Sequence, residues 1–166
     1  MLKRLYINNY RCLENFELTT LGLSSVLLIG KNGVGKSTVM AAIRILQSIA
    51  RGNSKISELI KKKDFARGRV DVPIRIEIEI ILNQSTYAYE LAIELPKDFK
   101  APRVFEEKLN VDGKEVFSRD IAQVNLHGPS HDTSFLVDWH LAALPVIQEP
   151  KDPKHMQLLR GWLSQS

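Results

Sequence analysis

The sequence predicts an α/β fold in which a mixed sheet carries an antiparallel layer, and three observations support this prediction. Residues 25–29 form a continuous apolar run of strand length, which is typical of a strand buried on both faces. A glycine-rich loop and an amphipathic helix follow this strand directly. From residue 72 onwards the hydrophobic period changes to two, which indicates antiparallel hairpins instead of further strand–helix units.

The composition is that of a globular domain with a core of its own. Of the 166 residues, 44% are hydrophobic, which is enough to bury a core. The longest apolar runs are far shorter than the roughly 20 residues that span a membrane, and no apolar leader follows Met1. Cys12 is the single cysteine, so it cannot form an internal disulfide, which fits a reducing compartment. We therefore expect a cytoplasmic protein with no membrane partner.

Two strands and two helices are predicted around the glycine-rich loop. Residues 2–8 and 16–18 have the pattern of short strands joined by a polar turn. A helix is predicted over residues 37–50, because apolar side chains recur there at helical spacing: Val39, Ala42, Ile43, Leu46 and Ile49. A second helix is predicted over residues 54–63, where three apolar side chains share one face.

An antiparallel meander is predicted over the middle of the chain. Apolar and charged residues alternate over residues 74–82 and again over residues 87–95, with a polar turn between the two segments. A second pair of strands covers residues 104–111 and 114–117. These strands meet at the dipeptide Asp112-Gly113, a strong signal for a two-residue hairpin turn.

The last third of the chain has weaker patterns. Residues 121–126 are predicted to form a strand, residues 135–144 a short helix, and residues 155–164 a helix with Leu159, Trp162 and Leu163 on one face. No capping residue follows this last helix. We therefore expect Trp162 to be partly exposed or covered by a neighbouring copy.

The loop after the buried strand fits the pattern G-x-x-x-x-G-K-[ST] with Gly30, Gly35, Lys36 and Ser37, and Thr38 follows. Glycines let successive backbone N–H groups point at phosphate oxygens, and the helix N-terminus adds partial positive charge. The lysine reaches the β- and γ-phosphates, the serine hydroxyl binds Mg²⁺, and the threonine can bond the α-phosphate. The sequence therefore predicts a binding site for a nucleoside triphosphate with Mg²⁺. The intervening loop residues expected to line it are Lys31, Asn32, Gly33 and Val34.

This loop, together with residues 5–11 and Phe16, resembles the N-terminal lobe of the ABC-type ATPases of the SMC/RecF/OLD group. The resemblance implies a P-loop NTPase fold of the ABC/SMC-head type. It also implies that the cofactors are ATP and Mg²⁺. Residues 1–166 would form one lobe of an incomplete head. Residues 1–50 would hold the strand pair, P-loop and helix, residues 70–118 the antiparallel meander, and residues 119–166 the start of a helical part.

The resemblance also implies roles for two further residues. Arg11 matches an arginine that touches nucleotide phosphate in the family, and Asn32 matches an asparagine beside the γ-phosphate. Each has an alternative. Arg11 can cap a strand or pair with Glu14, and Asn32 can serve only to adopt left-handed backbone.

ABC-type heads hydrolyse ATP with motifs that this sequence lacks: a Leu-Ser-x-Gly signature, an apolar strand ending in Asp-Glu, and a switch histidine. Gln148 and Gln123 are candidates for the glutamine that senses Mg²⁺ in the family, with a plain surface glutamine as the alternative. Asp138 follows an apolar run but precedes Trp139, so a solvated carboxylate at a helix start is favoured over a Mg²⁺ ligand. We expect nucleotide binding with slow hydrolysis by this chain alone.

Three functions remain open from the sequence. The favoured one is the ATP-binding lobe of a dimerisation switch, whose partners would be a second head in a homodimer and either DNA or an effector nuclease or toxin. The others are a self-contained small NTPase or kinase with Asp138 as metal ligand, and a nucleotide-sensing module that does not hydrolyse. The basic residues at positions 61–63, 67 and 69 fit a nucleic-acid backbone or a solvated surface, and the solvated surface is the favoured interpretation because charge runs usually face water. His127 and His131 are expected to be loop residues.

Overall fold

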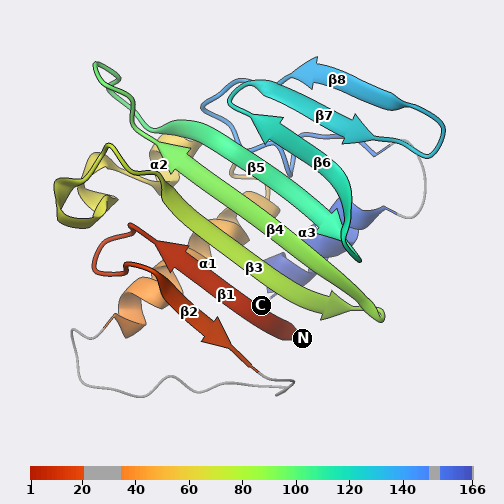
Figure 1. Cartoon of the computed structure of the whole chain (residues 1–166), viewed down its shortest axis with the longest axis horizontal. Coiled ribbons are helices and arrows are strands. Elements are labelled where there is room, and N and C mark those ends of the chain that lie inside the picture. The colour runs from red at the N-terminus through yellow and green to blue at the C-terminus, as the bar shows by residue number, and fades with distance from the viewer. Residues whose placement is uncertain (21–34, 150–153, 166) are drawn as a thin grey trace.

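The computed structural model describes residues 1–20, 35–149 and 154–165. These residues contain one sheet of eight strands, in the order β2-β1-β3-β4-β5-β6-β7-β8, and the helices α1 and α3 lie on one face of it (Figure 1). The strands are β1 (Leu2–Asn8), β2 (Phe16–Thr19), β3 (Ile74–Leu82), β4 (Ser85–Glu94), β5 (Arg103–Val111), β6 (Lys114–Asp120), β7 (Gln123–His127) and β8 (Asp132–Leu136). The helices are α1 (Lys36–Ala50), α2 (Ile56–Leu59) and α3 (His155–Gln165), with short 3-10 turns at Lys62–Asp64 and Ala66–Gly68.

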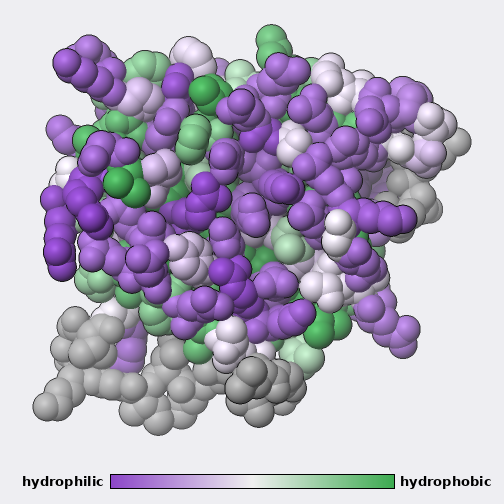
Figure 2. Space-filling model, viewed as in Figure 1, coloured by the Kyte–Doolittle hydropathy of each residue, from purple (hydrophilic) through white to green (hydrophobic). Residues whose placement is uncertain are grey.

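Alternation along the strands separates a core face from an open face. On β3, Ile74, Ile76, Ile78 and Ile80 are buried, whereas the intervening Arg75, Glu77 and Glu79 are half-buried. Strand β4 continues the core face with buried Tyr87, Tyr89, Leu91 and Ile93. Figure 2 shows that the opposite, open face of the sheet is largely hydrophilic. The predicted antiparallel meander is therefore confirmed, with one face packed and one in contact with solvent.

Tight turns set the register of the meander. Asp112 and Gly113 have φ values of 52° and 79°, so both turn residues are left-handed, as the two-residue hairpin between β5 and β6 requires. Asn83 and Gln84 also have positive φ, at 51° and 70°, between β3 and β4. Asparagine, aspartate and glycine tolerate this conformation best.

Helices α1 and α3 pack against each other and against the sheet. The side chains of α1 that are buried include Val39, Ala42, Leu46 and Ile49, all predicted from helical spacing. Arg51 Nη2 donates to the carbonyl of Ser164 at 2.7 Å, which ties the two helices together at their C-terminal ends. The predicted helix at the end of the chain is confirmed as α3, and Trp162 is half-buried, which agrees with the expected partial exposure.

The helix predicted over residues 135–144 is wrong. Phe135 belongs to β8, and the chain after this strand is irregular. Val137 N–H donates to the carbonyl of Ala122, while Ala143 and Leu144 donate to a buried carboxylate. Tertiary partners thus satisfy the backbone groups that a helix would have paired internally. The second helix was predicted too long, since α2 ends at Leu59 and residues 61–64 form a tight turn.

All strand pairs among the described residues are antiparallel. The parallel contribution to the predicted mixed sheet was expected from residues 25–29, which lie outside the described residues. In the part of the chain that the structure describes, no helix combines the length and apolarity needed to cross a membrane.

Candidate nucleotide-binding site

Gly35 is the residue on which α1 begins. It is the N-cap of the helix, with a left-handed φ of 94°. A Cβ added here would lie 3.1 Å from Leu13 Cδ2 and 3.6 Å from Cys12 Sγ. Both the backbone conformation and the close neighbours therefore require glycine, which explains why the second fixed glycine of the motif stands at this position.

The first turn of α1 presents the remaining motif residues. Lys36 is half-buried, Ser37 is exposed and Thr38 is buried, and the first turn contains no acidic residue. Thr38 Oγ1 accepts a hydrogen bond from Cys12 Sγ at 3.4 Å. Since a hydroxyl donates as well as accepts, this contact is compatible with the predicted bond from Thr38 to a phosphate. A helix N-terminus of this kind favours an anion.

A tight turn connects the first two strands and packs on the start of α1. Tyr10 and Leu13 exchange backbone hydrogen bonds of 3.1 and 2.9 Å, and Arg11 between them has a left-handed φ of 54°. Tyr10 is 1% exposed and also pairs with Phe65. The turn therefore holds Arg11 beside Cys12, which contacts Thr38.

Arg11 forms an ion pair with Asp64. Its Nε donates to Asp64 Oδ1 at 2.9 Å, and its backbone N–H donates to the carbonyl of Asp64 at 2.6 Å. The hydrogen bond to Asp64 is the main cause that raises the pKa of Arg11. Glu14 instead accepts hydrogen bonding from Arg69 and lies 3.8 Å from Arg67, so the alternative pairing of Arg11 with Glu14 is wrong. The guanidinium has four N–H donors besides Nε for an anion.

Residues 61–69 form a basic surface next to this turn. Asn9 is fully buried and anchors the segment, because its Nδ2 donates to the carbonyls of Arg69 and Val72 at 2.9 and 2.7 Å. The basic surface consists of six exposed residues: Arg11, Lys61, Lys62, Lys63, Arg67 and Arg69. The chain has 23 basic and 19 acidic residues. Without these six residues and their acidic partners Glu14 and Asp64, the chain has 17 basic and 17 acidic residues. The formal net charge of +4 therefore equals the charge of the basic surface together with these two partners.

The structure does not bring Gln148 to this site. Gln148 is exposed and lines a cavity of about 610 Å³ together with Ala50, at the far end of α1. Ser37 and Ala50 are separated along α1 by about 20 Å at 1.5 Å per residue. In this arrangement Gln148 lies by the opposite end of α1 from Ser37, which does not favour a Mg²⁺ shared by the two residues. Gln123, the other candidate, lies at the start of β7 and pairs with Asp120 and Leu136.

Asp138 and the histidines likewise lie outside the site. Asp138 Oδ1 accepts from the backbone N–H of His140 at 2.7 Å, in the irregular segment after β8. His127 ends β7 instead of lying in a loop, and its ring contacts Glu115 and Asp132. These carboxylates raise the pKa of His127. No group of three or more His, Cys, Asp or Glu among the described residues is arranged to hold a metal.

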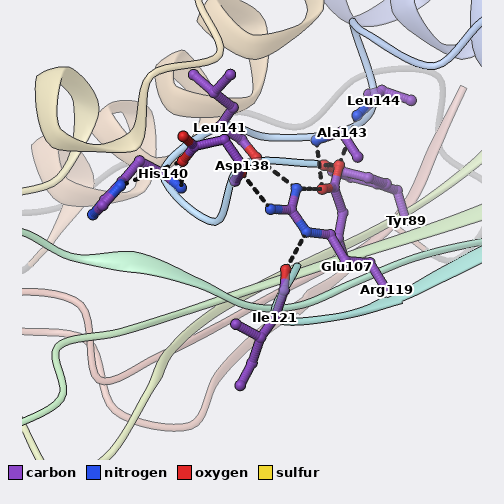
Figure 3. A network of polar contacts seen from close by, with 9 residues as sticks. All are labelled: Tyr89, Glu107, Arg119, Ile121, Asp138, His140, Leu141, Ala143 and Leu144. Atoms are coloured by element: carbon purple, nitrogen blue, oxygen red, sulfur yellow. Dashed lines mark hydrogen bonds and ion pairs between the residues drawn. The ribbon is translucent and has the colours of Figure 1, made fainter. Parts of the chain in front are cut away.

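A buried ion pair between Glu107 and Arg119 was missed by the sequence reasoning (Figure 3). Both side chains are fully buried. Glu107 accepts from Tyr89 and from two backbone N–H groups, and burial raises the pKa of Tyr89 well above its ordinary value. Arg119 donates to three carbonyls, which belong to Asp138, Leu141 and Ile121. The signal was present in the alternation, since a period of two puts Glu107 on the same face as buried Leu109.

Residues 1–135 match the AAA ATPase domain family, and the chain belongs to this family. The matched range includes the start of α1, the turn that carries Arg11 and the basic surface. The chain is therefore a P-loop ATPase domain. A stretch of 46 residues is 44% identical to the OLD nuclease of Thermus scotoductus, which supports the predicted resemblance to OLD-like proteins. This stretch is 28% of the present chain and 8% of that nuclease.

Residues 30–34 of the motif, including Gly30, Lys31, Asn32, Gly33 and Val34, lie outside the described residues. Their predicted roles stay predictions. The described half of the motif fits a nucleotide with Mg²⁺, because it combines an exposed hydroxyl at Ser37 with a helix N-terminus free of acidic residues in its first turn.

Proposed function

We propose that this chain binds MgATP at the start of α1 and is the ATP-binding lobe of an SMC/RecF/OLD-like ATPase. The observation that carries the proposal is the packing of the turn with Arg11 onto Gly35 and Thr38. Lys36 and the exposed hydroxyl of Ser37 lie in the first turn of this helix, and Arg11 belongs to the turn that packs on it through Cys12 and Leu13. Phosphate groups are the ligands that such an arrangement recognises.

Each residue has a distinct role in this proposal. Lys36 binds the β- and γ-phosphates, Ser37 provides a hydroxyl oxygen for Mg²⁺, and Thr38 bonds the α-phosphate. Arg11 adds a second cation from the neighbouring turn. Residues 30–34 would wrap the phosphates with backbone N–H groups. Bound Mg²⁺ supplies charge neutralisation of the phosphate oxygens.

Nucleotide binding would act as a dimerisation switch between two copies of the complete protein. A ligand shifts an equilibrium only by its differential affinity, so ATP must bind the closed pair more tightly than the open one. The γ-phosphate would contribute this difference by contacting both heads. We expect slow turnover by the present chain, because its sequence lacks the Leu-Ser-x-Gly signature and the Asp-Glu strand.

The basic surface supports a nucleic acid as the partner, because it carries the whole net charge of the chain close to the nucleotide site. A salt titration of DNA binding tests this, and affinity that does not fall with added salt would contradict it.

The similarity to an OLD nuclease supports an effector nuclease as the alternative partner. The single cysteine supports a cytoplasmic location, where thiols stay reduced.

Substitution of Lys36 tests the proposed function. We expect Lys36→Ala to weaken MgATP binding at least tenfold, which is about 1.4 kcal/mol, because an ammonium group is removed from the β- and γ-phosphates. Titration with a fluorescent ATP analogue measures the affinity. Arg44→Ala is the matched control, since Arg44 is an exposed cation on the same helix. Equal affinities of wild type and a folded Lys36→Ala would refute the proposal.

A self-contained NTPase is the second candidate, with Asp138 as its metal ligand. The carbonyl of Asp138 accepts from Arg119 and Leu141, and its carboxylate accepts from the backbone N–H of His140. These contacts do not favour Asp138 as a metal ligand. A phosphate-release assay decides between the two. Fast turnover by this chain that is lost in Asp138→Asn would favour the self-contained enzyme.

A further inference from the structure

Asp64 is a buried carboxylate that holds Arg11 at two points. Its side chain is 4% exposed, and Oδ1 accepts from Arg11 Nε at 2.9 Å. Its main-chain carbonyl accepts from the backbone N–H of Arg11 at 2.6 Å. Oδ2 accepts from the backbone N–H of Lys61 at 2.8 Å, which closes the turn at residues 61–64. Both carboxylate oxygens are therefore used, one for the turn and one for the guanidinium.

The arginine is fixed on a second side by an aromatic ring. The guanidinium carbon of Arg11 lies 5.1 Å from the ring centroid of Tyr10, which is itself buried. The Arg11 side chain remains 45% exposed despite these contacts. The guanidinium is thus held by two buried groups while part of it faces solvent.

The same turn lies against the start of α1. Cys12, the residue after Arg11, contacts Thr38, and Leu13 lies against Gly35. Asp64 fixes Arg11, and the next residue in the chain, Cys12, contacts the start of α1 where the phosphates are proposed to bind. Among the described residues, the side-chain hydrogen bonds of Asp64 go to Arg11 and Lys61, so Arg11 is the direct link from this carboxylate to the turn that packs on α1.

We propose that Asp64 is a positioning residue for the phosphate site, which keeps its bond to Arg11 Nε while other N–H donors of the guanidinium bind nucleotide phosphate. This inference rests on the proposed function. A charge-assisted hydrogen bond to a buried carboxylate fixes the plane of the guanidinium. A fixed arginine loses less side-chain freedom on binding than a mobile one, which favours the bound state.

A double-mutant cycle tests the proposal with MgATP as the probe. We expect Asp64→Asn to weaken MgATP binding by about threefold to tenfold in the wild-type background and to leave it unchanged in the Arg11→Ala background. Asparagine can still accept from Lys61 N–H, so the turn keeps its bond while the carboxylate charge is lost. A purely structural role of Asp64 would weaken binding equally in both backgrounds.

Glu14→Gln is the matched control. It removes one carboxylate from the same surface, but Glu14 binds Arg69 and Arg67 instead of Arg11. We expect its effect on affinity to be the same in both backgrounds. Equal losses for Asp64→Asn in the two backgrounds, no loss, or tighter binding in the wild-type background would each overturn the proposal.

A measurement on the wild-type chain covers the case in which Asp64→Asn does not fold. The Arg11 Nε–H resonance, assigned by its loss in Arg11→Lys, should exchange slowly with solvent both without and with MgATP. Fast exchange after MgATP is added would mean that Arg11 leaves Asp64, which overturns the proposal. If wild type does not bind MgATP, or Lys36→Ala binds equally well, the proposed function fails and this inference with it. Failure at Asp64 alone leaves the Lys36 result intact.

Discussion

At Gly35 the chain passes through a left-handed conformation and touches a neighbouring turn in the same place. A side chain here would meet Leu13 Cδ2 at 3.1 Å, and the φ of 94° is unfavourable for any residue with a Cβ. A Cβ at this position would therefore be unfavourable for two reasons, the backbone conformation and the contact with Leu13. The position links the stability of the fold to the geometry of the phosphate site.

We predict that Gly35→Ala destabilises the chain by about 1–3 kcal/mol, through backbone strain and displacement of Leu13. Urea denaturation measures this difference. Gly161→Ala is the control, because Gly161 lies within α3 and an added Cβ meets nothing within 4 Å. Alanine there should stabilise by about 0.5–1 kcal/mol. Loss of stability in both variants would show that the strain at Gly35 is not specific.

The segment after β8 is an element whose structure depends on side chains from other strands. Arg119 on β6 binds the carbonyls of Asp138 and Leu141, and Glu107 on β5 accepts from Ala143 and Leu144. Removal of one partner of a buried ion pair leaves the other charge unpaired, which is costly. The irregular path of this segment therefore depends on the pair.

We predict that Arg119→Met lowers the free energy of unfolding by about 3–5 kcal/mol, because the carboxylate of Glu107 is left without its cation. Chemical denaturation measures the loss. Arg75→Met is the matched control, since Arg75 pairs with the half-exposed Glu106 on the open face. A surface ion pair contributes about 0–1 kcal/mol. Equal losses in the two variants would contradict a special role for the buried pair.

The elements that could be predicted from sequence are those whose signal is local. The strands β3 to β6 follow from alternation and from the turn at Asp112 and Gly113, and α1 follows from its apolar spacing. The helix predicted over residues 135–144 failed because its backbone partners, such as Glu107, lie far away in the sequence. Local periodicity carries no information about such partners.

The candidate site divides in the same way. Gly35 to Thr38 could be predicted from the motif, because adjacent residues supply its chemistry. The pairing of Arg11 with Asp64 joins residues 53 positions apart. The sequence offered the neighbouring Glu14 as an alternative partner of Arg11 and did not suggest Asp64. Gln148 was placed by analogy, and the length of α1 separates it from Ser37.

Charge is distributed unevenly over the whole molecule. The basic surface adjoins the turn that packs on the start of α1, whereas charged residues on the open face of the sheet are mainly acidic. On that face Glu17, Glu77, Glu79, Glu90 and Glu106 stand against the basic Arg4, Arg75 and Lys108. An anionic ligand is therefore attracted to the end of the molecule at which α1 begins.

Hydrogen exchange with and without MgATP tests the central claim most directly, because it locates the nucleotide on the fold. The account predicts that MgATP slows exchange at residues 35–38 and 10–13, since the phosphates bind at the start of α1. Residues around the cavity lined by Ala50, Gln148 and Met156, at the opposite end of this helix, should exchange unchanged. Protection confined to that cavity, with none at residues 35–38, would contradict the account.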